Sequence, residues 1–482
     1  MRPRSGDSLR KWMTKGIGGR LCLFLLVAGT ACTREQPFVK VSKADPRYLE
    51  LGTGETFIPV GPNICFPRRV TEGDSLLSYY DYYFGRLAAN GGNFTRIWLS
   101  VPLLEIEQEE PGAYDPATVA LIDGLVGLGE KHGIYIKFCL EHFRKITGAP
   151  APFPSSVPFD KPVYKDRVAS MEEYFSGETG KKLFLARASF LAERYGRRPQ
   201  VFGWELWNEI NAVSVAEKPL LLAWTTEMLQ KVKEKSPGQL VMQTLGSYDS
   251  ESQQERYRVY SALEGNEIAQ AHRYLDQGAA LPACQAPMDE LAADAVRNLL
   301  SFALAKPVIL SEVGAVEPNH AGPSKLYEKD SSGMLLHDLL FAPFFSGAAA
   351  PGQSWHWDYY IEKQDLWWHF SRFKEALGNF DPIAEKAKPF FSTGEGNLKI
   401  YGLKGTQKVL LWIRDGASDW KTELVAGLPP GTVAGRWLEP DLPVAGKVSF
   451  YDPWKGRWTS GAPGKRILLP EFSRSIIVKM EY

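Results

Sequence analysis

The stretch Val201-Phe202-Gly203-Trp204-Glu205-Leu206-Trp207-Asn208-Glu209 is a short apolar run that ends in a carboxylate. A second run, Lys306-Pro307-Val308-Ile309-Leu310-Ser311-Glu312, also ends in a carboxylate much further along the chain. Short apolar runs bounded by turn residues predict buried strands. In a barrel of alternating strands and helices, distant strands end at one common rim. We therefore expect Glu209 and Glu312 to meet there.

From residue 38 to about residue 390, β-branched runs alternate with amphipathic helices. This alternation predicts parallel strands joined by helical crossovers. The predicted strands lie near Val60 and at 94–99, 135–140, 201–206, 240–244, 267–271, 307–310 and 352–357. Eight such strands favour an α/β fold of the (β/α)₈ TIM-barrel type, in which active residues stand at the carboxyl ends of the strands.

The helices between these strands have clear apolar faces. The helix expected over 184–195 places Phe184, Ala188, Leu191 and Tyr195 on one face, and Gly196 ends it. The segment 220–232 repeats the pattern, and a hairpin is expected at 49–60, before the first strand. The Pro- and Gly-rich segment 146–176 has no helical period, and we expect it to form a wall of a cleft.

The pattern changes after residue 393. Short strands are predicted at 398–401, 409–413, 448–451 and 476–478, separated by turn residues and without helices. The expected organisation is a barrel domain at 33–393 followed by a small all-β sandwich domain at 394–482.

The charge balance limits the classes of partner. The 482 residues include 56 Lys plus Arg and 56 Asp plus Glu, so the formal net charge is zero. Such a chain lacks the electrostatic footprint of a nucleic-acid-binding or anionic-membrane-binding protein. Its 14 Trp and 20 Tyr suit a neutral ligand with apolar faces, such as a sugar, although large aromatics also fill cores.

The first 32 residues resemble an export signal with a lipoprotein cleavage box. A basic lead precedes the apolar run 21–28, which is too short to span a bilayer, and Gly29-Thr30-Ala31-Cys32 follows. We expect Cys32 to be lipidated in an exported bacterial lipoprotein, periplasmic or cell-surface, that meets the membrane only through this anchor. Ordinary cleavage near Ala31, which would give a secreted protein, is the alternative. A monomer is expected.

The remaining cysteines and the histidines predict no metal site and no cofactor. Cys65, Cys139 and Cys284 are an odd number without C-x-x-C spacing, which excludes a zinc ribbon and a disulfide-rich scaffold. None of the seven histidines forms H-x-H or H-E-x-x-H, the spacings that place two imidazoles on one ion. A metal-dependent hydrolase is therefore disfavoured.

Further polar and aromatic residues lie near the predicted strand ends beside the two glutamates. They are Arg96, His142, Asn208, His272, Tyr274, Trp355 and Trp357. In kind and in order, this set resembles glycoside hydrolase family 5, and more broadly clan A of the retaining (β/α)₈-barrel β-glycosidases. The resemblance covers the predicted barrel and implies cleavage of β-linked glycans, either mannan- or glucan-type polysaccharides or oligosaccharides.

The resemblance also assigns roles. Glu312 would be the nucleophile, supported by Arg96 and Tyr274, and Glu209 would be the acid and base of a double displacement. A neighbouring ionised Glu312 would raise the pKa of Glu209.

Asn208 would bind the sugar 2-hydroxyl, His142 and His272 would orient the site, and Trp355 would form its floor. Trp357 would support the substrate or belong to the core. The alternative from a different class is a non-catalytic glycan-binding surface lipoprotein on a decayed barrel.

Overall fold

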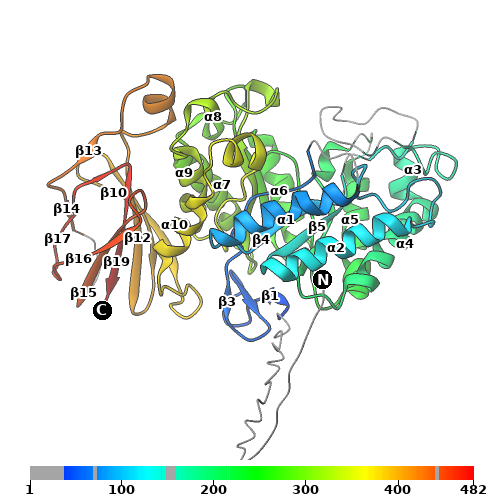
Figure 1. Ribbon diagram of the computed structural model, residues 1–482, viewed down its shortest axis with the longest axis horizontal. Helices are drawn as coiled ribbons and strands as arrows, with labels where there is room; N and C mark the ends of the chain where they lie inside the picture. Colours follow the sequence, from blue (N-terminus) through cyan, green and yellow to red (C-terminus); the bar gives the residue numbers. More distant parts are fainter. Residues whose placement is uncertain are drawn as a thin grey trace, which may run out of the picture. The chain divides into compact units, whose positions relative to one another are not determined.

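Six of the eight expected strands form parallel ladders (Figure 1). One sheet has the order β4-β5-β6-β7, and a second sheet pairs β8 with β9. Their bounds are β4 (Phe94–Trp98), β5 (Tyr135–Glu141), β6 (Val201–Trp207), β7 (Leu240–Met242), β8 (Ala269–Leu275) and β9 (Val308–Ala315). Every residue of these strands is buried, as expected when helices cover a parallel sheet.

The structure is a computed structural model that describes residues 37–68, 73–142, 144–147, 159, 161–213, 215, 218–439 and 444–482. The predicted signal segment 1–32 lies outside the described residues, and so does the proposed lipid site at Cys32. In the described part of the chain, no helix combines the length and apolarity needed to cross a bilayer.

The predicted first strand near Val60 and eighth strand at 352–357 are wrong, because neither segment forms a regular ladder. The chain there still makes backbone hydrogen bonds, among them those from Trp98 N to Cys65 O (2.9 Å) and from Asn63 N to Ser354 O (2.8 Å). Val313 and Ser354 form a single parallel bridge. Prolines at 59, 62, 67 and 351 explain the interruption, because a proline has no N–H to donate to a ladder.

Helices follow most of the strands and pack on one another, α1 against α2 and α4 against α5. Their bounds are α1 (Gly73–Ala89), α2 (Pro116–His132), α3 (Met171–Ser176), α4 (Glu178–Tyr195), α5 (Lys218–Lys235), α6 (Gln254–Ala262), α7 (Met288–Ser301), α8 (Leu326–Lys329), α9 (Met334–Phe345) and α10 (Trp368–Leu377). The helices predicted over 184–195 and 220–232 are confirmed as parts of α4 and α5.

Two shorter segments correct the predictions. The segment 146–176 is not wholly irregular, because its end forms α3, where the Ser170 side chain accepts a hydrogen bond from Glu173 N (3.1 Å). The predicted eighth strand ends in a π-helical turn at Trp357–Glu362. The predicted hairpin at 49–60 is confirmed in β2 (Leu49–Leu51) and β3 (Thr56–Phe57), which pair with each other, and β2 also pairs with β1 (Val39–Val41).

The C-terminal region is antiparallel and all-β, as predicted. A six-stranded sheet has the order β10-β11-β12-β19-β15-β16, and two ribbons pair β13 with β18 and β14 with β17. The bounds are β10 (Lys388–Gly394), β11 (Leu398–Lys404), β12 (Lys408–Asp415), β13 (Thr432–Val433), β14 (Trp437–Leu438), β15 (Lys447–Asp452), β16 (Arg457–Gly461), β17 (Ile467–Leu468), β18 (Phe472–Ser473) and β19 (Ser475–Glu481). The expectation of no helix there is wrong, because Lys421–Val425 forms a π-helical turn.

The parallel and antiparallel regions share buried ion pairs. Arg414 on β12 binds Asp338 on α9 through two contacts of 2.9 and 3.1 Å, and all of these atoms are buried. Lys399 on β11 lies 2.9 Å from Asp289 on α7. Residues 36–482 accordingly form one compact unit. The three cysteines described, Cys65, Cys139 and Cys284, are free and buried.

Candidate active site

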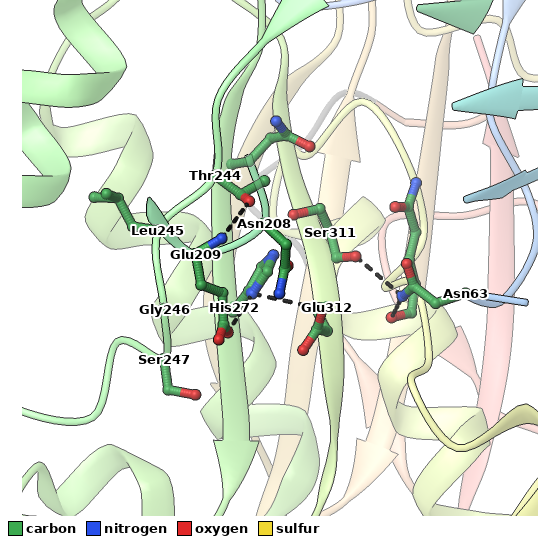
Figure 2. A network of polar contacts seen from close by, with 12 residues as sticks. Asn63, Asn208, Glu209, Thr244, Leu245, Gly246, Ser247, His272, Ser311 and Glu312 are labelled. Carbon is green, nitrogen blue, oxygen red and sulfur yellow. Dashed lines mark hydrogen bonds and ion pairs between the residues drawn. The ribbon is translucent and has the colours of Figure 1, made fainter. Parts of the chain in front are cut away.

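The two glutamates come from strands that meet at one rim. Glu209 directly follows Asn208 at the end of β6, and Glu312 lies on β9. One carboxylate oxygen of each lies within 4.8 Å of the other and of a ring nitrogen of His272. Figure 2 shows both carboxylates pointing the same way, with His272 beside them. The structure therefore brings together two acidic groups from distant parts of the sequence.

Arg96 on β4 is the centre of the charge network. Its guanidinium is fully buried and donates to Oε2 of Glu312 (2.8 Å) and to Oδ1 of Asn208 (2.6 Å). It also makes two parallel bonds to Glu205, of 2.8 and 2.6 Å. The Tyr274 hydroxyl donates to the other oxygen of Glu312 (2.5 Å). Both oxygens of Glu312 thus accept hydrogen bonds from buried donors, which fixes the orientation of the carboxylate.

Glu205 is the fixed negative charge of the site. Burial alone would raise its pKa, but Arg96 and Lys137 outweigh that effect and lower the pKa to about 2. Lys137 Nζ lies 3.3 Å from the carboxylate, and the Thr244 hydroxyl donates to it. The ionised Glu205 in turn fixes the plane of the Arg96 guanidinium.

Glu209 has the opposite electrostatic character. Burial raises its pKa to about 7, and burial is the largest cause, not the charge of Glu312 that the sequence led us to expect. Its Oε1 lies 2.8 Å from Nδ1 of His272. Burial lowers the pKa of His272 to about 4, so that ring is neutral at pH 7. Glu209 is consequently able to hold a proton near neutrality.

The backbone at Glu209 is strained. Its φ of 51° and ψ of 52° are left-handed, a conformation that costs a non-glycine residue roughly 1 kcal/mol or more. Its N–H donates to the Thr244 hydroxyl (3.3 Å), and Gly246 lies close to its Cβ. The end of β7 therefore holds Glu209 in this conformation, which turns its carboxylate toward Glu312.

Aromatic rings form the adjacent surface. The Trp98 ring stacks on His142 with centroids 3.6 Å apart and lies 5.0 Å from the ring of Trp355. Trp355 is half-buried and thus reachable by a ligand. Trp357 is fully buried, and its indole N–H donates to the Tyr79 hydroxyl (2.9 Å), so it supports the floor from within.

His142 joins this aromatic surface to the polar network. Its Nδ1 lies 3.3 Å from Nδ2 of Asn208, whose Oδ1 already accepts from Arg96. Burial places the pKa of His142 well below its usual value, so the ring is neutral. All seven supporting residues predicted from the sequence therefore lie in or directly beneath this cluster.

Two other members of the site, Thr244 and Asn63, were not predicted from the sequence. Thr244 could have been found from its place at the end of a predicted strand, as Asn208 was. Asn63 lies in the proline-rich first segment, where its amide donates to the backbone oxygens of Ser311 (3.1 Å) and Gln353 (2.9 Å). No spacing rule links it to the residues it contacts.

A metal ion is a poor fit to the donors present. Among the described residues, Glu209, His272 and Glu312 form a group whose spacing suits a metal ion. Both oxygens of Glu312, however, already accept bonds from Arg96 and Tyr274. A cation there would also lie beside the buried guanidinium, and like charges repel strongly where water is excluded.

The comparisons with known proteins agree with this geometry. No family model matches the sequence. Over 216 residues the chain is 26% identical to a protein of Oryza sativa subsp. japonica named Mannan endo-1,4-beta-mannosidase 3, a match to 39% of this chain and 42% of that protein. The chain thus spans about two fifths of the length of this curated relative.

Solved structures match over nearly the whole chain. One named Glycoside hydrolase has a TM-score of 0.61 at 13% identity and covers 92% of this chain and 97% of its own. A glycoside hydrolase family 5 from Bacteroides vulgatus has a TM-score of 0.58 at 14% identity, with 93% and 94% covered. The chain therefore has the fold of family 5 glycoside hydrolases, the family that its ordered site residues resemble.

Proposed function

We propose that the protein is a retaining glycoside hydrolase that cleaves β-linked glycans. The observation that carries the proposal is the distance below 4.8 Å between carboxylate oxygens of Glu209 and Glu312. Retaining glycosidases hold their two carboxyl groups about 5–5.5 Å apart, whereas inverting enzymes need roughly 6.5–9.5 Å to admit a water. The shorter separation favours direct attack by one carboxylate.

The different surroundings of Glu312 and Glu209 indicate which is the nucleophile and which is the acid. Glu312, oriented by Arg96 and Tyr274, attacks the anomeric carbon while Glu209 gives its proton to the leaving oxygen. A covalent glycosyl-enzyme forms, and the charge of Glu312 is gone. Glu209, now a carboxylate, takes a proton from water as that water attacks the anomeric carbon and releases the sugar with retained configuration.

The neighbours would prepare this reaction. Because Oδ1 of Asn208 accepts from Arg96, its Nδ2 is the donor group, and it has two N–H bonds: one can donate to Nδ1 of His142 and the other to a sugar 2-hydroxyl. Trp355 offers a half-exposed ring on which a pyranose face can lie. The neutral His272 fixes the carboxyl of Glu209 between leaving group and nucleophile.

We further propose that the strands close into a (β/α)₈ barrel. Backbone hydrogen bonds join β7 to β8 through Tyr248 N and His272 O (2.8 Å) and through Glu267 N and Val241 O (3.1 Å). Bonds of the same kind link the irregular first segment to β4 on one side and to the eighth segment on the other. A closed barrel would place all of the site residues at its carboxyl-terminal face.

The substrate that we favour is a β-linked mannan, because the curated relative is named a mannan endo-1,4-β-mannosidase. A glucan-type chain is the other member of the expected class. Export as a lipoprotein through Cys32 and a monomeric state remain proposals that rest on the sequence alone.

Glu209→Gln and Glu312→Ala, assayed on mannan, glucomannan and cellulose oligosaccharides, test the proposal. We expect each change to lower kcat by at least about 10³-fold while glycan affinity stays near that of the wild type. Proton NMR of the first product should show the β-anomer. An α-anomer would contradict the retaining mechanism, and unchanged turnover in both variants would contradict the assignment of the site. Binding without turnover in the wild type would favour a non-catalytic receptor.

A further inference from the structure

Three polar side chains outside the catalytic pair form a chain of contacts on the Glu209 side of the site. His320 lies in the middle, with Nδ1 2.9 Å from Oδ2 of Asp276 and Nε2 3.0 Å from Oγ of Ser247. Ser247 follows β7, Asp276 follows β8 and His320 follows β9. The Asp276–His320–Ser247 triad therefore ties together three loops at the rim, and the mechanism above assigns it no role.

The backbone is strained to place this ring. Asn319 (φ 61°, ψ 36°) and His320 (φ 58°) are both left-handed, which is unusual for two successive residues other than glycine. The buried carboxylate of Asp276 holds them there, because it accepts from the N–H groups of Gly278 (2.7 Å), Asn319 (2.9 Å) and His320 (3.2 Å). Strain that surrounding contacts over-determine is typical of functional positions.

The loop that follows Asp276 and the loop that contains Asn319 and His320 pack so closely that their backbones touch. A Cβ added at Gly278 would lie 2.6 Å from the backbone nitrogen of Asn319, a separation that real side chains do not reach. The Asp276 loop therefore needs a glycine to receive the His320 loop. This close fit fixes the imidazole while 38% of its side chain stays exposed.

The triad reaches the catalytic groups through its neighbours. The His320 ring meets the ring of Tyr274 edge to face at 5.0 Å, and Tyr274 donates to Glu312. Figure 2 places Ser247 on the same side as Glu209, whereas Asn63 lies beyond Glu312. A Cβ added at Gly246, the residue before Ser247, would lie 3.7 Å from Cβ of Glu209. Because Glu209 is the proton donor in the proposed mechanism, this is the side on which the leaving sugar sits.

We propose that Ser247, held in place by His320 and Asp276, is the first binding contact for the leaving sugar, with His320 as the residue that positions its hydroxyl. This inference rests on the retaining function proposed above. His320 Nδ1–H donates to Asp276, and its Nε2 accepts the hydroxyl proton of Ser247. The lone pairs of the Ser247 oxygen then accept a hydroxyl proton from the sugar, which aligns the glycosidic oxygen with the acid.

The inference predicts a dependence on the leaving group. A sugar leaves only when its oxygen is protonated, whereas a 2,4-dinitrophenolate leaves without a proton. His320→Gln should therefore lower kcat/KM on mannopentaose by about 10²-fold and on 2,4-dinitrophenyl β-mannobioside by only about two-fold. Cellopentaose and 2,4-dinitrophenyl β-cellobioside are assayed in the same way. The variants are compared on whichever pair of substrates, mannose- or glucose-based, the wild type cleaves. His132→Gln removes a histidine that contacts Asp81 on α1 and should match the wild type on every probe.

Several outcomes would overturn the inference. Equal losses on the sugar and dinitrophenyl probes would mean that the triad only stabilises the rim. Covalent labelling of Ser247 by a fluorophosphonate would indicate a nucleophilic serine instead. If the wild type cleaves the probes, Glu312→Ala does not and His320→Gln equals the wild type, this inference alone fails. If the wild type cleaves none of them, the proposed function fails, and this inference fails with it.

Discussion

Arg96 illustrates how one buried cation organises several acceptors. Its fork reaches Glu205, Glu312 and Asn208, and an unpaired partner at this depth would cost several kcal/mol. Lys137 supplies a second buried cation next to Glu205. Two cations thus balance two carboxylates, and among the described residues no Lys or Arg hydrogen bond reaches the carboxyl of Glu209. Burial therefore raises the pKa of Glu209 without a bonded cation to offset it.

The raised pKa of Glu209 predicts the upper limb of the pH profile. The acid must be protonated to assist the leaving sugar, and its pKa of about 7 means that this form is lost as the pH rises through 7. We expect kcat/KM on an oligosaccharide to fall about ten-fold per pH unit above that point.

The measurement is kcat/KM from pH 5 to pH 9 on an oligosaccharide and on a dinitrophenyl glycoside. The dinitrophenyl substrate should lack this limb, since its leaving group needs no proton. A limb of the same height and midpoint on both substrates would assign the ionisation to another group.

Among the elements, β6 can pair closely with β7 only because a glycine, Gly203, stands at the contact. Gly203 pairs with Leu240 on β7, and a Cβ there would lie 2.4 Å from the Leu240 carbonyl oxygen. Because that atom belongs to a strand backbone, it cannot move aside cheaply. Gly203→Ala should lower the free energy of unfolding by about 1–3 kcal/mol and disturb the strand that carries Asn208 and Glu209.

Gly127→Ala is the matched control. Gly127 lies inside α2 and has no heavy atom of another part of the chain within 4 Å of an added Cβ. Alanine should stabilise the helix by about 0.5–1 kcal/mol. Urea unfolding monitored by tryptophan fluorescence measures both variants. If Gly203→Ala leaves the free energy of unfolding unchanged, β6 and β7 can separate at this point.

The elements that the sequence predicts best are those with unbroken apolar runs. β5, β6 and β9 were found because their burial on both faces requires such runs. β8 is predicted at 267–271 but spans Ala269–Leu275, because the polar His272-Arg273-Tyr274 ends the apolar run while the strand continues. Glu209 and Glu312 could be predicted, since each ends a run. The Asp276–His320 contact could not, because it is made between two loops whose path no local pattern fixes.

On the scale of the whole molecule, α9 joins the parallel and antiparallel regions. All of its residues are buried, and it contacts β9 on one side and β11 and β12 on the other. A helix that is buried on every side needs packing partners on every side. The C-terminal sheet is therefore part of what keeps α9 out of water, whether or not it also binds glycan.

The Asp338–Arg414 pair tests this shared core. Both side chains are buried, so Asp338→Ala leaves a guanidinium without its partner and should lower the free energy of unfolding by about 3–5 kcal/mol. Asp338→Leu combined with Arg414→Met removes both charges and refills the space, so it should cost less than the single change. Denaturant unfolding of the full chain measures all three proteins. A double variant that is less stable than Asp338→Ala would mean that the ion pair stabilises the junction beyond removing its own desolvation cost.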